Sequence, residues 1–260
     1  MKLQFKEQQF QKDAVQAVVN CFEGQPLKTN RFTLERSVEI IRRAKQAAAG
    51  SNELFEKEIF EEIGYRNSPI QISEQHILEN IRKIQLAGDI HESTAIERPK
   101  EDKNRSYHLT IEMETGTGKT YTYIRTMYEL HKKYGWSKYI VIVPSVAIRE
   151  GVFKSFQLTQ DHFQELYGHK IAPFIYNSGS PQDIENFASD SRISVMIINT
   201  QAFNARGADA RRIYQELDQF GTRKPIEIIS QTNPILIIDE PQSVDGAKTL
   251  ESMQDFKPLF

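Results

Sequence analysis

The sequence has few of the features that mark specialised protein classes. Its 260 residues include one cysteine, Cys21, which excludes an internal disulfide framework and suits a reducing compartment. No apolar run approaches the ~20 residues that a membrane-spanning helix requires. The first ten residues, MKLQFKEQQF, lack a secretory-signal pattern. These absences predict a cytoplasmic protein without a membrane partner.

Neither sign of charge dominates the chain. The 33 lysines and arginines are nearly balanced by 35 aspartates and glutamates, so the formal net charge is −2. Net charge therefore provides no long-range attraction for nucleic acid, and any contact with DNA has to come from a local patch.

The chain changes character near residue 106. Before this point the apolar spacing is helical, with a polar, charged linker at the end. The predicted elements are a helix over 3–22, a helical region over 33–63 split near 49–52, a helix over 73–87 capped by Ser73, and a loop over 92–106. The apolar face predicted for the first helix is Phe10, Ala14, Val15, Val18, Val19 and Phe22.

After residue 106, short apolar runs rich in β-branched residues alternate with helical patterns. The predicted strands are 107–113, 138–143, 171–176, 193–198 and 234–238, and the predicted helices are 118–133, 145–157, 208–220 and 244–254. This alternation predicts an α/β domain with a mainly parallel sheet buried on both faces. We expect an N-terminal helical region over 1–106 and a second domain over 107–260.

The motif METGTGKT, residues 113–120, follows the first predicted strand. Gly116 and Gly118 permit backbone angles that turn consecutive amides toward an anion, and the following helix adds its N-terminal N–H groups. Lys119 would reach the β- and γ-phosphates of a nucleotide, and the Thr120 hydroxyl would bind Mg²⁺. The general pattern has glycine where this chain has Met113. A glycine-rich turn that only caps a helix is the alternative interpretation. The predicted nucleotide-binding residues of the loop are Thr115, Gly116, Thr117, Gly118, Lys119 and Thr120.

The run ILIIDE, residues 235–240, ends a predicted strand with two carboxylates. The carboxyl ends of parallel strands are where ligands bind in open sheets. Asp239 is placed to hold Mg²⁺ through water, and Glu240 to orient and deprotonate an attacking water. A solvated turn is the alternative for this pair. Together with Lys119, these two acids are the predicted catalytic residues, and Thr120 and Asp239 are the predicted metal ligands.

Three short motifs resemble those of the superfamily 2 helicases and translocases. DEPQ at 239–242 is similar to their motif II, and ETGTGKT at 114–120 to their motif I, where alanine is usual at the Met113 position. FQKDAV at 10–15 resembles their upstream glutamine motif, which implies that Gln11 reads the adenine edge. Gln8 and Gln9 are competitors for that role, and the polar face of a helix is the alternative.

Two further stretches resemble DNA-contacting elements of that superfamily. VIVPSVAIREG, residues 141–151, is similar to motif Ia, which implies that Ser145 and the amides after it grip a backbone phosphate and that Arg149 adds charge. IINTQAF, residues 197–203, is similar to a later element in which Thr200 is the hydroxyl donor. A solvated Arg149 and a plain strand-end loop at Thr200 are the alternatives.

The set METGTGKT, VPSVAIREG, DEPQSVDG and FKPLF resembles most closely the restriction subunit of Type III restriction–modification enzymes. The resemblance runs from about residue 5 to the end. It implies a RecA-like, P-loop ATPase domain of an ATP-dependent Type III site-specific deoxyribonuclease, with ATP and Mg²⁺ as cofactors. The implied partners are double-stranded DNA and a modification methyltransferase subunit.

The second motor domain and the nuclease domain of that family have no counterpart in these residues. We therefore expect the 260-residue chain to bind ATP but to turn it over negligibly, because the arginines that complete such a site come from the second motor domain. Two other interpretations stay open. One is the first domain of a generic superfamily 2 DNA or RNA helicase, and the other is a non-catalytic nucleotide-binding module with a role in assembly.

Overall fold

A four-stranded parallel sheet lies at the centre of the molecule, in a computed structural model that describes residues 5–35, 61–98, 107–204, 209–216, 223–244 and 247–260. The strand order is β4-β5-β3-β6. Their bounds are β3 Lys138–Val143, β4 Ala172–Ile175, β5 Ser194–Asn199 and β6 Ile235–Ile238. β3 pairs in parallel with both β5 and β6, so the carboxyl ends of these strands lie at one edge of the sheet. The expected α/β class with a mainly parallel sheet is confirmed.

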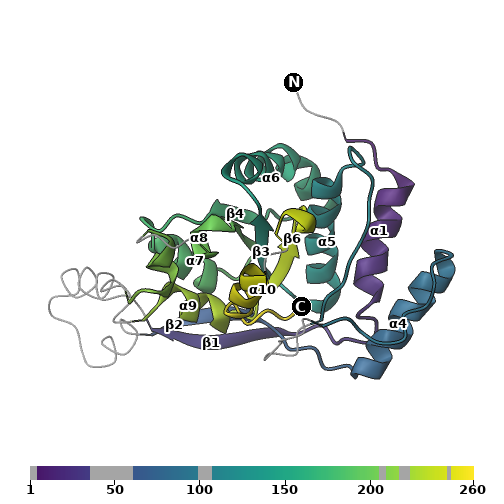
Figure 1. The fold of residues 1–260 in the computed structure, drawn as a ribbon, viewed down its shortest axis with the longest axis horizontal. Coiled ribbons are helices and arrows are strands. Elements are labelled where there is room, and N and C mark those ends of the chain that lie inside the picture. The colour runs from purple at the N-terminus through teal and green to yellow at the C-terminus, as the bar shows by residue number, and fades with distance from the viewer. Residues whose placement is uncertain (1–4, 36–60, 99–106, 205–208, 217–222, 245–246) are drawn as a thin grey trace.

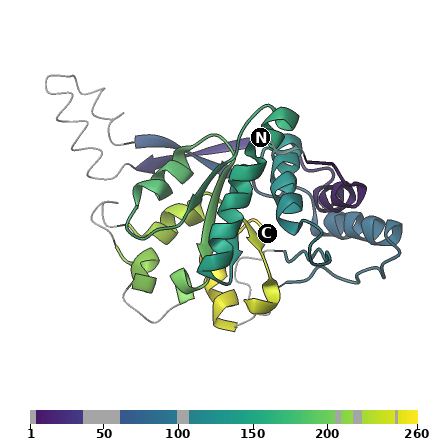
Figure 2. The ribbon, with the colours of Figure 1, turned by 90° about the horizontal axis from the view of Figure 1, so that it is seen from above.

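Helices cover both faces of this sheet (Figures 1 and 2). Their bounds are α1 Gln9–Asn20, α4 Glu74–Ala87, α5 Lys119–Tyr134, α6 Val146–Tyr167, α7 Gln182–Ser189, α8 Gln201–Asn204, α9 Pro225–Gln231 and α10 Ala247–Gln254. Two 3-10 helices, η1 Asp209–Tyr214 and η3 Pro241–Ser243, complete the described elements. None of the described helices is both long and apolar enough to span a membrane.

Alternate residues of each central strand pack against different helices. Successive strand side chains point to opposite faces, and the two apolar cores divide accordingly. The odd-numbered residues Tyr139, Val141, Val195 and Ile197 join the core under α5 and α6. Their even-numbered neighbours Ile140, Ile142, Met196 and Ile198 join the core with α7, α9 and α10. Complete burial of β3 and β5 follows from this two-sided cover.

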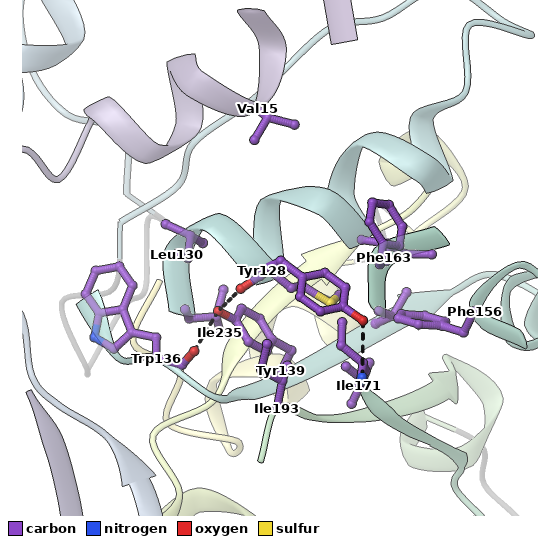
Figure 3. Close-up of a cluster of buried hydrophobic side chains, with 14 of the residues drawn as sticks. Val15, Tyr128, Leu130, Trp136, Tyr139, Phe156, Phe163, Ile171, Ile193 and Ile235 are labelled. Carbon is purple, nitrogen blue, oxygen red and sulfur yellow. Dashed lines mark hydrogen bonds between the residues drawn. The ribbon is translucent and has the colours of Figure 1, made fainter. Parts of the chain in front are cut away.

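The core under α5 is rich in tyrosines that make hydrogen bonds (Figure 3). The Tyr139 hydroxyl lies near the carbonyl oxygens of Met127 and Trp136, at 3.1 and 3.0 Å. The Tyr128 hydroxyl accepts a bond from the Ile171 amide at 3.2 Å. These bonds satisfy buried polar groups, so the ring area of each tyrosine is buried without an unpaired hydroxyl.

α1 packs against α5 and belongs to the same core. Val15, Val19 and Phe22 are buried in it, as the helical spacing predicts. Phe10, which the same spacing places on the apolar face, lies in the first turn of α1 and is 49% exposed. The prediction for α4 is confirmed in detail, since Ser73 caps it by accepting a hydrogen bond from the His76 amide.

The predicted helical region 33–63 begins and ends in strands rather than helices. β1 (Thr29–Glu35) and β2 (Glu61–Asn67) pair antiparallel in a two-stranded ribbon, and residues 36–60 lie outside the described part of the chain. The prediction is wrong at both ends because it followed the helix-favouring composition of the region. It missed the alternation of inward-facing and exposed residues at the amino-terminal end of the region. Phe32 and Leu34 point inward to the core, whereas Arg31 and Thr33 are exposed.

The predicted strand 107–113 is also wrong. The segment is irregular, and its one ladder contact is an isolated bridge between His108 and Glu97. The open side of β6 is bonded instead by the C-terminal residues. The Leu259 amide donates to Pro234 O at 2.8 Å, and the Leu236 amide donates to Phe260 O at 3.1 Å. The C-terminal residues thus bond this edge of β6 in the described part of the chain.

The remaining predictions differ mostly in length. The helix expected over 145–157 continues to Tyr167 as α6, and the one expected over 244–254 is α10, with residues 245–246 outside the described part. The described part of 208–220 forms the 3-10 helix η1. The sequence interpretation omitted α7, α8 and α9, which have eight, four and seven residues and are too short to show a sustained helical period.

Candidate functional site

A tight loop connects residue 113 to α5. Gly116 and Gly118 have positive φ angles of 81° and 87°, the left-handed region that favours glycine. The amide and hydroxyl of Thr117 both donate to Glu114 O, at 3.4 and 2.6 Å, and close the turn. Gly118 is the N-cap of α5 and supplies no side-chain cap, so the first-turn N–H groups of the helix are available to a ligand.

Gln11 lies against this loop from α1. Its side-chain amide donates to Thr117 O at 2.8 Å, and the residue is nearly buried. A Cβ at Gly118 would lie 2.6 Å from Gln11 Nε2, whereas a Cβ at Gly116 would meet nothing within 4 Å. The space over Gly116 therefore remains open while Gln11 supports the loop from behind. Of the competitors, Gln9 bonds Asp13 on its own helix at 2.8 Å, and Gln8 is exposed at the helix start.

The two acids follow β6 on the same side of the molecule as the loop. The Asp239 amide donates to Ile142 O at 3.0 Å, which continues the β3–β6 pairing by one residue. Glu240 has a φ of 56°, and this turn directs its side chain toward the start of α5. Glu240 Oε1 lies 3.7 Å from Lys119 Nζ, and each of the two side chains is 38% exposed. Residues 121 positions apart in the sequence thus share one site.

Asp239 is the more buried of the two acids. Burial raises the pKa of its carboxyl group, and the neighbouring Glu240 carboxylate raises it further. The Tyr123 hydroxyl donates to Asp239 Oδ2 at 3.4 Å and acts in the opposite direction. Two carboxylates in a partly buried place concentrate negative charge, which a cation would relieve.

The donors at this site fit a magnesium–triphosphate group. Mg²⁺ prefers oxygen ligands, and the side chains of Thr120 and Asp239 provide a hydroxyl and a carboxylate. Two left-handed glycines, uncapped helix N–H groups and the Lys119 ammonium provide the complementary donors for phosphate. The raised pKa of the Asp239 carboxyl group reflects a negative charge that is poorly compensated at this site, which agrees with this donor set.

Tyr123 is a residue of the site that the sequence interpretation missed. It stands three residues after Thr120 on α5, so the two side chains share a face of the helix, and Thr120 is one of its hydrogen-bonding partners. The sequence does contain a signal for this residue, since Tyr123 follows Thr120 at the i, i+3 spacing that places two side chains on one face of a helix. A tyrosine in an apolar helix is, however, indistinguishable by sequence from a core residue.

The predicted DNA-contacting residues lie along the same edge of the sheet. Ser145 caps α6 and accepts a hydrogen bond from the Ile148 amide at 3.3 Å. The Thr200 amide donates to Val143 O at 3.1 Å, so the ends of β3 and β5 stay adjacent. Arg149 joins the two loops, because its Nη1 donates to Asn199 Oδ1 at 3.3 Å. The structure thus brings Ser145, Arg149 and Thr200 together.

Comparison with known proteins identifies the family. The family model described as "Type III restriction enzyme, res subunit" matches residues 4–256. The chain belongs to this family. Among curated proteins, it is 32% identical over 214 residues to the Type III restriction-modification enzyme EcoP15I Res subunit of Escherichia coli, which covers 75% of this chain.

Two further Res subunits are similarly related. The EcoPI Res subunit of Escherichia phage P1 is 32% identical over 213 residues, which cover 75% of this chain. The StyLTI Res subunit of Salmonella typhimurium is 35% identical over 160 residues, or 55% of this chain. The matched region is 21%, 21% and 16% of these three relatives, so this Res-family chain spans about a fifth of their length.

Proposed function

We propose that this chain is the ATP-binding motor domain of a Type III restriction enzyme and that Mg²⁺–ATP binds between the 114–118 loop and the Asp239–Glu240 pair. The observation that carries the proposal is the 3.7 Å approach of Lys119 Nζ to Glu240 Oε1. A nucleotide-hydrolysis site has two halves, a lysine that binds phosphate and an acid at the end of a strand. In this family, the meeting of both at one edge of the sheet corresponds to such a site.

Each residue of the site has a distinct task in this proposal. The loop amides and Lys119 hold the phosphates, and Thr120 and Asp239 hold the metal, which neutralises the charge that develops during transfer. Glu240 orients a water and takes its proton, since it is an exposed carboxylate beside the phosphate position. Gln11 supports the loop through Thr117 O, and the adenine contact implied by the glutamine motif is part of the same proposal.

Coupling to DNA is proposed for the full-length protein. Ser145, Arg149 and Thr200 would contact the backbone of double-stranded DNA, on the loops that follow β3 and β5. Support comes from the junction of these loops through Arg149 and Asn199, next to the proposed nucleotide site. The names of the relatives describe Res subunits of restriction-modification enzymes, which supports a modification methyltransferase partner and an endonuclease role for the complete protein.

The isolated chain should hydrolyse ATP very slowly. An arginine near the transferring phosphoryl group contributes on the order of 10³–10⁵ in rate, and we assign that arginine to the part of the full-length relatives outside the matched region, which is 21% of their length. The full-length relatives are about five times longer and have ample chain to supply it. DNA-stimulated turnover near one per second by the 260-residue chain would contradict this part of the proposal.

Titration of a fluorescent, non-hydrolysable ATP analogue with Mg²⁺ tests the binding site. Lys119→Ala should weaken the affinity at least about tenfold, because it removes a charge-assisted contact to phosphate worth roughly 1.5–3 kcal/mol. Lys132→Ala, at the far end of α5, is the matched control and should bind like wild type. Equal affinity of Lys119→Ala and wild type would remove Lys119 from the site, and no binding by either would contradict a nucleotide site in this chain.

A further inference from the structure

Tyr123 connects the two sides of the proposed metal site. It lies in the second turn of α5, and its hydroxyl donates to Asp239 Oδ2 at 3.4 Å across the gap between α5 and β6. Thr120, one helical turn earlier, is its other hydrogen-bonding partner. One side chain thus contacts both residues to which the metal is assigned, although it is not placed to bind the metal itself.

The direction of these hydrogen bonds determines which oxygen atoms face the metal. A carboxylate has two oxygens, and a donor on Oδ2 holds the plane of the Asp239 carboxyl group so that Oδ1 stays available. Donors of this kind, which touch the ligands but not the metal, orient metal sites in many proteins.

The chemistry of a phenol suits this task better than that of a cation would. A phenol has an ordinary pKa of about 10, so the Tyr123 hydroxyl keeps its proton and remains a donor throughout the neutral range. A lysine or arginine at the same place would compete with Mg²⁺ for the negative charge of Asp239. A neutral donor fixes the geometry and leaves that charge to the metal.

We infer that Tyr123 is a positioning residue for the magnesium ion. Its hydroxyl holds Asp239 and Thr120 in the orientation that binds the metal. The inference deepens the proposed function and rests on it, since it needs a metal at these residues. It concerns the affinity for the ion rather than that for the nucleotide, which separates it from the roles of Lys119 and the loop glycines.

Tyr123→Phe tests the inference, because it removes one oxygen atom and keeps the ring. In the presence of ADP, binding of Mn²⁺ is followed by the electron paramagnetic resonance signal of the free ion. Mn²⁺ affinity should fall about tenfold, the lower end of the range for residues that support metal ligands. Affinity for ADP in EDTA should change less than twofold, because no phosphate contact is lost.

Tyr134→Phe is the matched control. It removes a buried phenol donor from the same helix, where Tyr134 bonds Val19 O at 2.8 Å, about 16 Å along α5 from Tyr123. Its Mn²⁺ affinity should equal that of wild type, even if its thermal midpoint falls as much as that of Tyr123→Phe. A purely structural role of Tyr123 predicts that the two variants behave alike.

Asp239→Asn and Lys119→Ala separate the failure of the inference from that of the proposed function. Wild-type Mn²⁺ affinity in Tyr123→Phe, with loss in Asp239→Asn, would overturn the positioning role and leave the nucleotide site intact. Unchanged Mn²⁺ and ADP binding in both Asp239→Asn and Lys119→Ala would overturn the proposed function, and the inference with it. Equal loss in Tyr123→Phe and Tyr134→Phe would also overturn the positioning role.

Discussion

The polar groups at the two ends of the central strand β3 differ in their burial and in how completely they are paired. At its amino end, Asn67 is completely buried and fully bonded. Its side-chain amide donates to Lys138 O and Asn233 O, at 2.8 and 2.9 Å, and its Oδ1 accepts from the amides of Ser137 and Lys138, at 2.7 and 3.0 Å. At the carboxyl end, Lys119 and Glu240 are half-exposed and 3.7 Å apart.

Lys138 and Lys119 show the same contrast between two lysines. Lys138 Nζ is buried at the amino end and donates to the carbonyls of Phe187 and Asp190, at the end of α7. Burial lowers its pKa to about 7, although Asp190 opposes the shift. Lys119 is 38% exposed and has a single, loose ionic partner. Saturated polar groups stabilise a fold, whereas loosely paired charges leave capacity for a ligand.

The largest effect on stability is expected at the amino end. Asn67→Ala would leave four backbone groups without their partner, which costs about 3 kcal/mol or more, since each buried unsatisfied group costs roughly 1–3 kcal/mol. Urea denaturation of the variant measures the loss. Glu240→Gln is the comparison variant and should change the free energy of unfolding by less than about 0.5 kcal/mol. A similar loss in both variants would contradict the division between the two ends.

A smaller effect, divided between stability and binding, is expected for the loop glycine. Gly118→Ala places a Cβ in the left-handed region, at a cost of roughly 1–2 kcal/mol, and 2.6 Å from Gln11 Nε2. We expect a moderate loss of stability and a loss of nucleotide affinity of about tenfold, because the loop has to move away from Gln11. Unfolding curves and analogue titration measure the two effects.

Gly168→Ala measures the loss of stability that comes from the left-handed backbone alone, at a position outside the nucleotide site. Gly168 has a φ of 79° at the end of α6, and its Cβ would meet nothing within 4 Å. This variant should lose a similar amount of stability and keep full nucleotide affinity. A comparable loss of affinity in both variants would show that general strain, and not the loop geometry, governs binding.

Much of the site was predictable from the sequence because local patterns encode it. The apolar runs at 138–143 and 235–238 became β3 and β6, and their parallel pairing brings Asp239 to the carboxyl edge. The glycines before Lys119 predicted a left-handed turn at a helix start, and the φ angles confirm it. Motif spacing predicted that the loop and the acids lie on one side of the sheet, since parallel strands align their carboxyl ends.

The remainder depends on contacts between segments that are distant in sequence. The segment 107–113 has a strand-like composition, but the pairing that the structure describes for it is an isolated bridge between His108 and Glu97. The antiparallel ribbon joins residues 29–35 to 61–67, and the short period-two pattern at 31–34 does not show which segment it pairs with. Tyr123 became a candidate only when its hydroxyl was located 3.4 Å from Asp239, 116 residues away.

A double-mutant cycle on Lys119 and Asp239 tests most directly whether the loop and the acids share one ligand. Affinity for a non-hydrolysable ATP analogue is measured in saturating Mg²⁺ for wild type, Lys119→Ala, Asp239→Asn and the double variant. Residues that contact one metal–triphosphate group are energetically coupled. We therefore predict that the loss of affinity in the double variant differs by at least about threefold from the product of the losses in the two single variants. Strictly multiplicative losses, or affinities that do not depend on Mg²⁺, would contradict a shared site.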